Sequence, residues 1–231
     1  MTDGVLLVSH GSVARLEELP EFLTRIRRGR PPEDSLLAEM THRYSTIGAS
    51  PLVATTRLQA EALAARLGLP VYIGMRFSEP SLQSALVAAR ERERLLILPV
   101  APFSVHVYDA AVRQLAAALH LEQPALPVPE LLSAEPWGNE PEFVECLARA
   151  ISPSLAHEGE LVLTAHSLPQ SVIDAGDPYD QQVRALAASL QEKLGRRATL
   201  AYQSQGASGG RWIGPPLRDV LEGLAKGGAR R

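Results

Sequence analysis

Two short apolar runs, each leading into a histidine, constrain the fold of this chain more than any other feature. Residues 5–8 run through Ser9 into His10, and residues 161–165 run directly into His166. Apolar runs of this length are typical of strands buried in a parallel sheet. Because ligands bind at the carboxyl ends of strands in α/β sheets, the sequence predicts one imidazole at the mouth of each of two similar half-domains.

Two histidines that face one cleft are able to hold a metal ion, because neutral imidazole is the commonest metal ligand in proteins. Spacing alone leaves a second interpretation open for both residues. His166 is also consistent with a hydrogen-bonded polar residue at the end of a strand. For His10, spacing by itself favours a simple strand-to-helix turn, in which Gly11 supplies the backbone freedom that such a turn needs.

Strand-like and helix-like segments alternate along the whole chain. The predicted strands fall at 4–9, 70–75, 94–100, 126–132, 160–165 and 198–203. The periodic stretches between them predict helices at about 16–28, 33–45, 55–67, 80–92, 109–120, 140–151, 180–195 and 215–226. This alternation indicates an α/β fold built from parallel β-α-β units with right-handed crossovers.

The stretch 155–159 is the predicted boundary between the two half-domains. The first, residues 1–154, contains four of the predicted strands, and the second, residues 155–231, contains the remaining two. A half-domain with a sheet of two strands is small for this architecture. We therefore expect the second half to be incomplete.

Composition excludes several classes of protein. A formal net charge of −3 over 231 residues argues against a general nucleic-acid binder. Because Cys146 is the single cysteine, no intrachain disulfide is possible, and we expect no iron–sulfur cluster held by the protein. The sequence contains no recognisable signal peptide or membrane span, so we expect a cytoplasmic protein.

The segment 27–30 contains three arginines at the predicted end of a helix. Cations at this position complement the helix dipole, which is the simpler interpretation. The functional interpretation is a carboxylate clamp, because guanidinium groups bind carboxylates bidentately. Further hydrogen-bond donors follow at Arg43, Tyr44 and Ser50.

The segment after His166 contains a clear signal for the start of a helix. Asp177 suits an N-cap position and Pro178 suits the first helical position. We therefore expect the helix predicted over 180–195 to begin directly after these two residues.

Taken in order, these motifs resemble those of ferrochelatases, most of all the bacterial coproporphyrin III type. The most specific are His166-Ser167-Leu168-Pro169 and Gly176-Asp177-Pro178-Tyr179. The other matching segments are residues 26–31, 43–52, 72–76 with 79–80, and 203–206 with 212–215. The resemblance extends over nearly the whole chain.

The resemblance implies two Rossmann-like, chelatase-type half-domains with parallel sheets flanked by helices and a cleft between them for a porphyrin. It implies a lyase that inserts Fe²⁺, as a substrate and without a permanently bound cofactor, late in haem synthesis, with handover of the product to haem-using enzymes. His166 matches the family histidine that accepts pyrrole protons or handles the metal, and His10 lies on the opposite side of the metal. The remaining matches contact the macrocycle or its propionates and are Arg27, Arg43, Tyr44, Ser50 and Tyr108.

The resemblance also leaves alternatives open. Relatives continue beyond the point that corresponds to Arg231 with another strand, an acidic motif and a closing helix, and this segment supplies a glutamate that pairs with the histidine. We expect His10 to compensate in part, because imidazole suits Fe²⁺. The alternatives are a sirohydrochlorin-type chelatase, in which a histidine occurs in a similar His-Gly-Ser context, and a catalytically impaired protein that binds porphyrin or metal.

Overall fold

The computed structural model describes residues 2–156, 159–205 and 210–227. Its contacts divide the chain into two compact units, Met1–Glu135 and Pro136–Arg231. The boundary predicted between the two half-domains, after residue 154, remains a prediction. The compact units change over earlier, because the helix α6 (Pro141–Ile151) packs against α8 (Tyr179–Leu194) in the second unit.

The first unit is built on a parallel four-stranded sheet in the order β2-β1-β3-β4. Its strands are β1 (Asp3–Ser9), β2 (Val71–Met75), β3 (Arg94–Pro99) and β4 (Glu130–Ser133). β1 lies between two partners, with Leu6 opposite Tyr72 on one side and Ile97 on the other. Six of its seven residues are buried, as expected for a central parallel strand.

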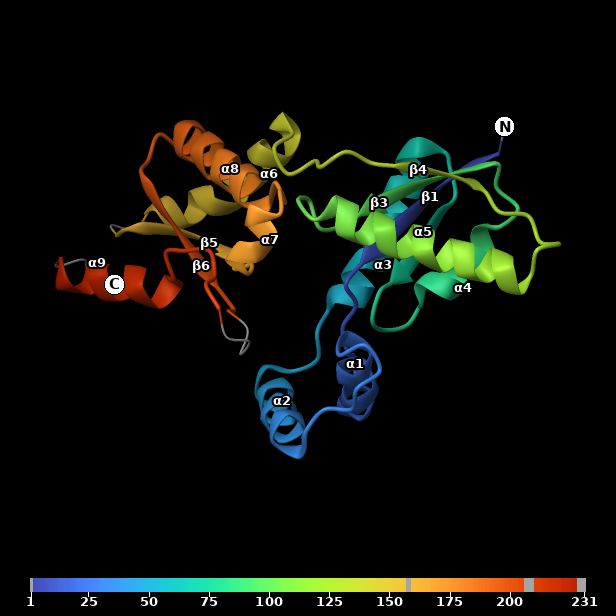
Figure 1. Ribbon diagram of the computed structural model, residues 1–231. Helices are drawn as coiled ribbons and strands as arrows, with labels where there is room; N and C mark the ends of the chain where they lie inside the picture. Colours follow the sequence, from blue (N-terminus) through green and yellow to red (C-terminus); the bar gives the residue numbers. More distant parts are fainter. Residues whose placement is uncertain (1, 157–158, 206–209, 228–231) are drawn as a thin grey trace. The chain divides into compact units, whose positions relative to one another are not determined.

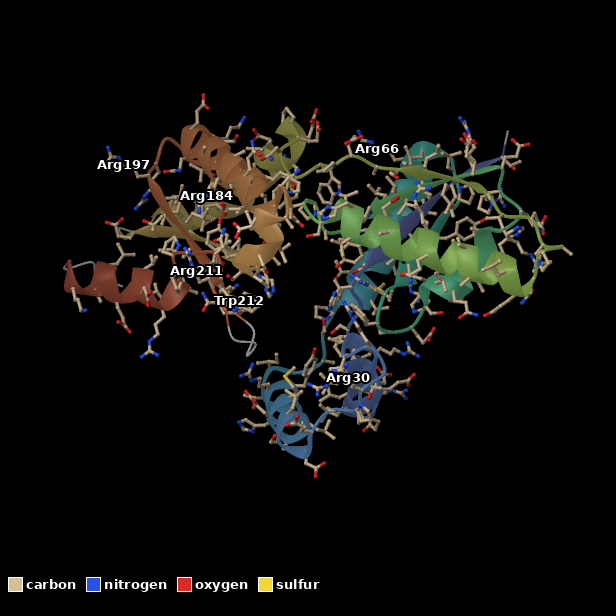
Figure 2. All side chains as sticks on the ribbon, in the orientation of Figure 1. Arg30, Arg66, Arg184, Arg197, Arg211 and Trp212 are labelled. Atoms are coloured by element: carbon tan, nitrogen blue, oxygen red, sulfur yellow. The ribbon has the colours of Figure 1, made fainter. Side chains whose placement is uncertain are left out.

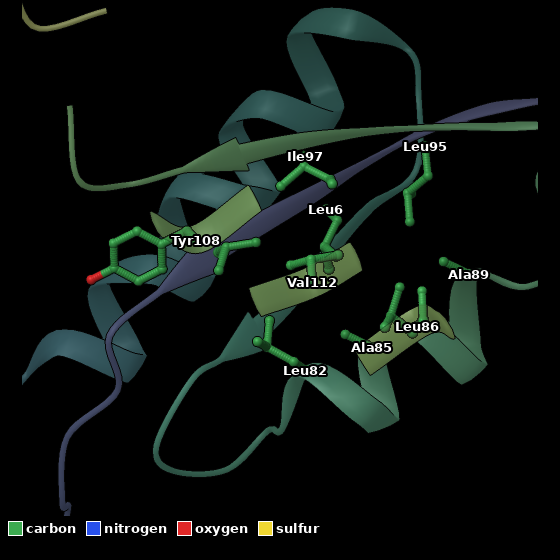
Figure 3. Packing of buried hydrophobic residues seen from close by; sticks show 11 residues of the cluster. Leu6, Leu82, Ala85, Leu86, Ala89, Leu95, Ile97, Tyr108 and Val112 are labelled. Carbon is green, nitrogen blue, oxygen red and sulfur yellow. The ribbon is translucent and has the colours of Figure 1, made fainter. Parts of the chain in front are cut away.

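Helices cover both faces of this sheet (Figure 1). They are α3 (Leu52–Leu67), α4 (Leu82–Ala89) and α5 (Val105–Glu122). Leu6 on β1 and Ile97 on β3 pack with Leu86 on α4 and Val112 on α5 in the largest hydrophobic cluster (Figure 3). Because neighbouring residues of a strand point to opposite faces, Leu7 points away from this cluster, on the face that α3 covers.

A helical arm follows β1. It consists of the 3-10 turn η1 (Leu16–Glu18), α1 (Leu19–Ile26) and α2 (Asp34–Ile47). Its small core contains Leu19, Phe22 and Leu23, and Met40 and Tyr44 of α2 pack against it. The arm lies beyond the carboxyl end of β1 (Figure 1).

The second unit has a parallel sheet of two strands, β5 (Leu161–His166) and β6 (Ala198–Gln203). Besides α6 and α8 it contains η2 (Ser152–Ala156), α7 (Gln170–Asp174) and α9 (Leu217–Lys226). Its core is formed by Val144 and Ala148 of α6 with Leu190 of α8, and Leu163 of β5 packs against them. None of the helices in the described part of the chain combines the length and apolar character that crossing a membrane requires.

All six predicted strands and the α/β fold are confirmed, and several local predictions differ. β4 begins at Glu130 instead of 126, because Pro127 and Pro129 have no backbone N–H to donate to the ladder with β3. The short helix α7 was not predicted, since five residues are too few to produce a periodic pattern. Pro178 is the N-cap of α8 instead of its first residue, and the Asp177 carboxylate accepts a hydrogen bond from the Tyr179 N–H at 2.9 Å.

The turn after His10 does require glycine. Gly11 has a φ of +92°, and a Cβ at this position would lie 2.6 Å from the Ser78 Oγ and 3.0 Å from the Ser78 backbone N. The Ser78 Oγ also accepts a hydrogen bond from the Ser12 N–H at 3.1 Å. The turn therefore sits directly against the segment that follows β2, and a side chain at position 11 would separate them.

We predict that Gly11→Ala lowers the free energy of unfolding by more than Gly29→Ala. Gly29 also has a positive φ, of +86°, but a Cβ at this position would meet no atom of another part of the chain within 4 Å. Both substitutions incur backbone strain of about 1–2 kcal/mol, and only Gly11→Ala adds the collision with Ser78. Urea unfolding followed by far-ultraviolet circular dichroism measures the difference, and equal losses for both variants would contradict the predicted collision.

Candidate functional site

The carboxyl end of β1 is held by the segment that follows β2. The Arg76 N–H donates to the Ser9 carbonyl oxygen at 2.9 Å, and the Phe77 N–H donates to the His10 carbonyl oxygen at 3.1 Å. The Phe77 ring meets the His10 imidazole edge to face, with ring centroids 4.8 Å apart. His10 itself is exposed, so the structure presents an accessible imidazole on a firmly held backbone.

Arg76 lies at the same edge of the sheet, between two aromatic rings. Its guanidinium carbon is 5.0 Å from the centroid of the Phe77 ring and 5.8 Å from that of Tyr108. Tyr108 is only 8% exposed and belongs to the main hydrophobic cluster (Figure 3). Burial raises the pKa of the Tyr108 hydroxyl, and the positive charge of Arg76 offsets this only in part. His10, Phe77, Arg76 and Tyr108 therefore form a continuous row, called here the aromatic–cation row.

The predicted helix end at residues 27–30 is confirmed, since α1 ends at Ile26 and Arg27 is its C-cap. Arg28 has a positive φ of +57°, which turns the chain sharply away from the helix. The Nε of Arg27 is buried and has no hydrogen-bond partner among the described residues. A buried guanidinium nitrogen without an acceptor is costly, and a ligand carboxylate would satisfy it.

The other predicted substrate contacts are distributed over the arm and the start of α3. Arg43 is exposed and forms an ion pair with Glu39, one turn earlier on α2. Tyr44 packs against the same small core as Phe77 and also lines a hollow of about 480 Å³ that faces residues 13–17. The Ser50 Oγ accepts a hydrogen bond from the Leu52 N–H at 3.3 Å and so stabilises the start of α3.

His166 is the last residue of β5 and is exposed. Its carbonyl oxygen accepts a hydrogen bond from the Tyr179 hydroxyl at 3.0 Å. The following residue, Ser167, is fully buried, and its hydroxyl donates to the Ile213 carbonyl oxygen at 2.8 Å. Its N–H donates to the Gln203 carbonyl oxygen at 2.7 Å, which extends the pairing with β6 beyond His166. The imidazole of His166 is therefore displayed from a backbone that several polar contacts hold.

A group of polar side chains from α8 and β6 lies close to the end of β5. The Tyr202 hydroxyl, on a side chain only 1% exposed, donates to the Asp180 carboxylate, and the Arg184 Nε donates to the same carboxylate at 2.9 Å. Arg184 also donates a hydrogen bond to the Gly214 carbonyl oxygen at 3.3 Å. Burial raises the pKa of the Asp180 carboxyl, but the hydrogen bonds from Arg184 and Tyr202 outweigh it, and the pKa lies below its ordinary value. Burial and Asp180 together raise the pKa of Tyr202.

Metal ligands do not gather in large clusters. Within residues 2–156, 159–205 and 210–227, no group of three or more His, Cys, Asp or Glu side chains is arranged to hold an ion. Each unit has one exposed histidine at the end of a strand, His10 in the first and His166 in the second. Cys146 is a free, exposed cysteine.

Sequence reasoning placed the two histidines correctly at strand ends, but it assigned no role to Arg76, Phe77 or Tyr202. Arg76 follows β2 as His10 follows β1, so its place directly after a predicted strand could have indicated a functional role from the sequence. Tyr179 was recognised only as part of a motif. Its hydrogen bond to His166 depends on how α8 packs, which no local pattern reports.

We predict that Asp180→Asn destabilises the second unit by about 1–2 kcal/mol, through loss of the charge-assisted bond with Arg184. Because the pKa of Asp180 is lower in the folded chain than in the unfolded one, its contribution is complete above about pH 4 and is lost as the pH falls through the folded value. Urea unfolding monitored by the fluorescence of Trp137 and Trp212, both in this unit, measures the effect.

The control for this prediction is Glu192→Gln, an exposed carboxylate on the same helix, which should leave stability unchanged. The difference between wild type and Asp180→Asn should shrink as the pH is lowered from 7 towards 3. A difference that stays constant over this range would show that the charge of Asp180 contributes nothing.

Comparison with known proteins places this geometry in context. The family model described as Ferrochelatase matches residues 2–231. The coproporphyrin III ferrochelatase of Anoxybacillus flavithermus is 32% identical over 243 residues, which cover 96% of this chain and 75% of that protein. The coproporphyrin III ferrochelatase of Bacillus subtilis is 29% identical, covering 96% and 76%, and the ferrochelatase of Thermus thermophilus is 31% identical, covering 97% and 80%.

Proposed function

Because this chain belongs to the ferrochelatase family, we propose that it inserts Fe²⁺ into coproporphyrin III as a step of haem biosynthesis. Membership of the family makes it a metal chelatase of the lyase class, with a porphyrin and Fe²⁺ as substrates. The observation that carries the choice of porphyrin is the match over 96% of the chain to proteins named for coproporphyrin III. Action in the cytoplasm, without an iron–sulfur cluster and with handover of product to haem-using enzymes, completes the proposal.

Metal insertion exchanges pyrrole protons for Fe²⁺, so a base must take up the protons that the nitrogens lose. We assign this role to His166, since histidine is the side chain that most often serves as a general base. Its exposure and its place at the end of β5 support the assignment. The Tyr179 hydroxyl holds the carbonyl oxygen of His166 and the buried Ser167 holds the next residue, so the backbone that carries the imidazole is fixed.

His10 is proposed as a ligand that delivers Fe²⁺ or as a second proton acceptor. Imidazole suits Fe²⁺, and the ring contact with Phe77 restricts the orientation of the side chain. The backbone bonds from Arg76 and Phe77 fix the strand end from which it projects.

Porphyrin binding is proposed to use the carboxylates of the substrate. The Nε of Arg27, buried and without a partner among the described residues, supports its role as a propionate ligand, and Arg43 would exchange Glu39 for a propionate. Tyr44, Ser50 and Tyr108 complete the proposed contact surface. A flat macrocycle hides its nitrogen lone pairs, and binding energy at the propionates is available to bend it.

Anaerobic incubation of the purified chain with Fe²⁺ and coproporphyrin III, protoporphyrin IX or sirohydrochlorin tests the proposed function. The change in absorbance on metal insertion reports turnover. Fastest turnover of coproporphyrin III is the expected result. Preference for sirohydrochlorin, or porphyrin binding without turnover, would overturn the proposal.

We predict that His166→Ala abolishes Fe²⁺ insertion while porphyrin binding is retained, because the variant removes the base and not the carboxylate ligands. His10→Ala should reduce turnover and weaken Fe²⁺ binding. Fixed-time absorbance assays measure Fe²⁺ insertion, and fluorescence titrations measure binding of the porphyrin and of Fe²⁺. Full activity of His166→Ala refutes its role as the base, and unchanged metal binding and turnover in His10→Ala refute the role of the second histidine.

We predict that Arg27→Ala and Arg43→Ala each weaken coproporphyrin III binding about tenfold or more. Each variant removes a charge-assisted hydrogen bond worth about 1.5–3 kcal/mol. Arg66→Ala is the matched control, because Arg66 is exposed in the last turn of α3 (Figure 2). Fluorescence titration gives the dissociation constants, and unchanged affinity for both Arg27→Ala and Arg43→Ala would refute propionate capture by the arm.

A further inference from the structure

Arg76 differs in its contacts from the arginines of the first unit that form ion pairs. Arg25 pairs with Glu21 and Glu79, Arg94 with Asp3, and Arg113 with Asp109. Among the contacts of the described residues, Arg76 has the two aromatic rings of the aromatic–cation row and no carboxylate. It is half-buried at the carboxyl edge of the sheet, where ligands of α/β proteins bind.

A guanidinium held against aromatic faces keeps its ability to bind an anion. Aromatic rings attract the positive charge of a guanidinium through their faces, and this attraction does not use its N–H donors. These donors match a carboxylate in a bidentate arrangement. Because no protein carboxylate competes for them in the described contacts, the arrangement is suited to a carboxylate supplied by a ligand.

Arg76 and the arginines of the arm would meet different parts of that ligand. Arg27 follows α1 and Arg43 lies on α2, and both helices lie beyond the end of β1 (Figure 1). Arg76 instead comes directly after β2, at the edge of the sheet. Its backbone N–H donates a hydrogen bond to the carbonyl oxygen of Ser9, next to His10. A porphyrin with carboxylates around its whole rim can satisfy both positions, whereas one with carboxylates confined to one side can satisfy only one.

We propose that Arg76 binds a further carboxylate of the porphyrin, beyond those bound by the arm, and thereby selects coproporphyrin III over protoporphyrin IX. The inference rests on the proposed function and adds a determinant of specificity to it. Phe77 has a double role in this arrangement, since one ring contacts both the His10 imidazole and the Arg76 guanidinium. Carboxylate binding at Arg76 would thus orient the macrocycle relative to His10.

The test is a fluorescence titration of Arg76→Met with both porphyrins. Methionine keeps an unbranched apolar stem against the rings and removes the charge and the donors. We expect about tenfold weaker binding of coproporphyrin III and a change within about twofold for protoporphyrin IX. Unchanged affinity for coproporphyrin III, or an equal loss for both porphyrins, would overturn the proposal.

Two further variants keep the test decisive. Arg76→Lys retains a positive charge without the planar fork, so it should lose less affinity for coproporphyrin III than Arg76→Met. It is also the variant to use if Arg76→Met does not fold by circular dichroism. Arg90→Met, on an arginine that follows α4 and pairs with Glu91, is the control and should bind both porphyrins as wild type does.

The outcomes separate this inference from the proposed function. If the wild-type chain neither binds coproporphyrin III nor inserts Fe²⁺ into it, the proposed function fails. If the wild-type chain does both and Arg76→Met keeps its preference for coproporphyrin III, the assignment of Arg76 alone fails.

Discussion

The burial of β1 is the constraint on which the first unit depends. This strand pairs with β2 and β3 at once, and its two faces are covered by helices on opposite sides of the sheet. Because its side chains are packed on both faces, a one-residue slip of its register would move every side chain into the packing of the opposite face. The same register fixes where the strand ends, and so it fixes the position of His10. Backbone bonds from Arg76 and Phe77 then hold that end against the neighbouring strand.

The charges around this strand end fall into two classes. Arg25, Arg43 and Arg113 pair with carboxylates of the protein, and such exposed pairs contribute little beyond local order. Arg27 and Arg76 lack such partners in the described contacts, and both are half-buried. Partly desolvated cations without a protein anion are the groups for which a carboxylate ligand gains the most. The distinction between the two classes is therefore a stronger guide to the site than the number of arginines.

The second unit holds its histidine in a different way. Among its described residues the sheet has two strands, so burial by neighbouring strands contributes less than in the first unit. Polar contacts contribute more to holding this strand end. The Tyr179 hydroxyl binds the carbonyl oxygen of His166, and the Ser167 hydroxyl is buried and hydrogen-bonded. Asp180 accepts hydrogen bonds from both Tyr202 and Arg184. A carboxylate with a lowered pKa stays charged at neutral pH, so this support is fully in place under the conditions in which His166 would accept protons.

The sequence by itself determined the strands, most of the helices and the placement of one histidine at each of two strand ends. These features are local, because apolar runs, Gly11 and Asp177 act through the residues next to them. The tertiary structure alone decided which side chains meet those histidines. Phe77 and Arg76 reach the His10 edge because β2 pairs with β1, and Tyr179 reaches His166 because α8 packs on the sheet of β5 and β6. Contacts between residues distant in the chain depend on sheet order and helix packing, for which a single sequence contains no local signal.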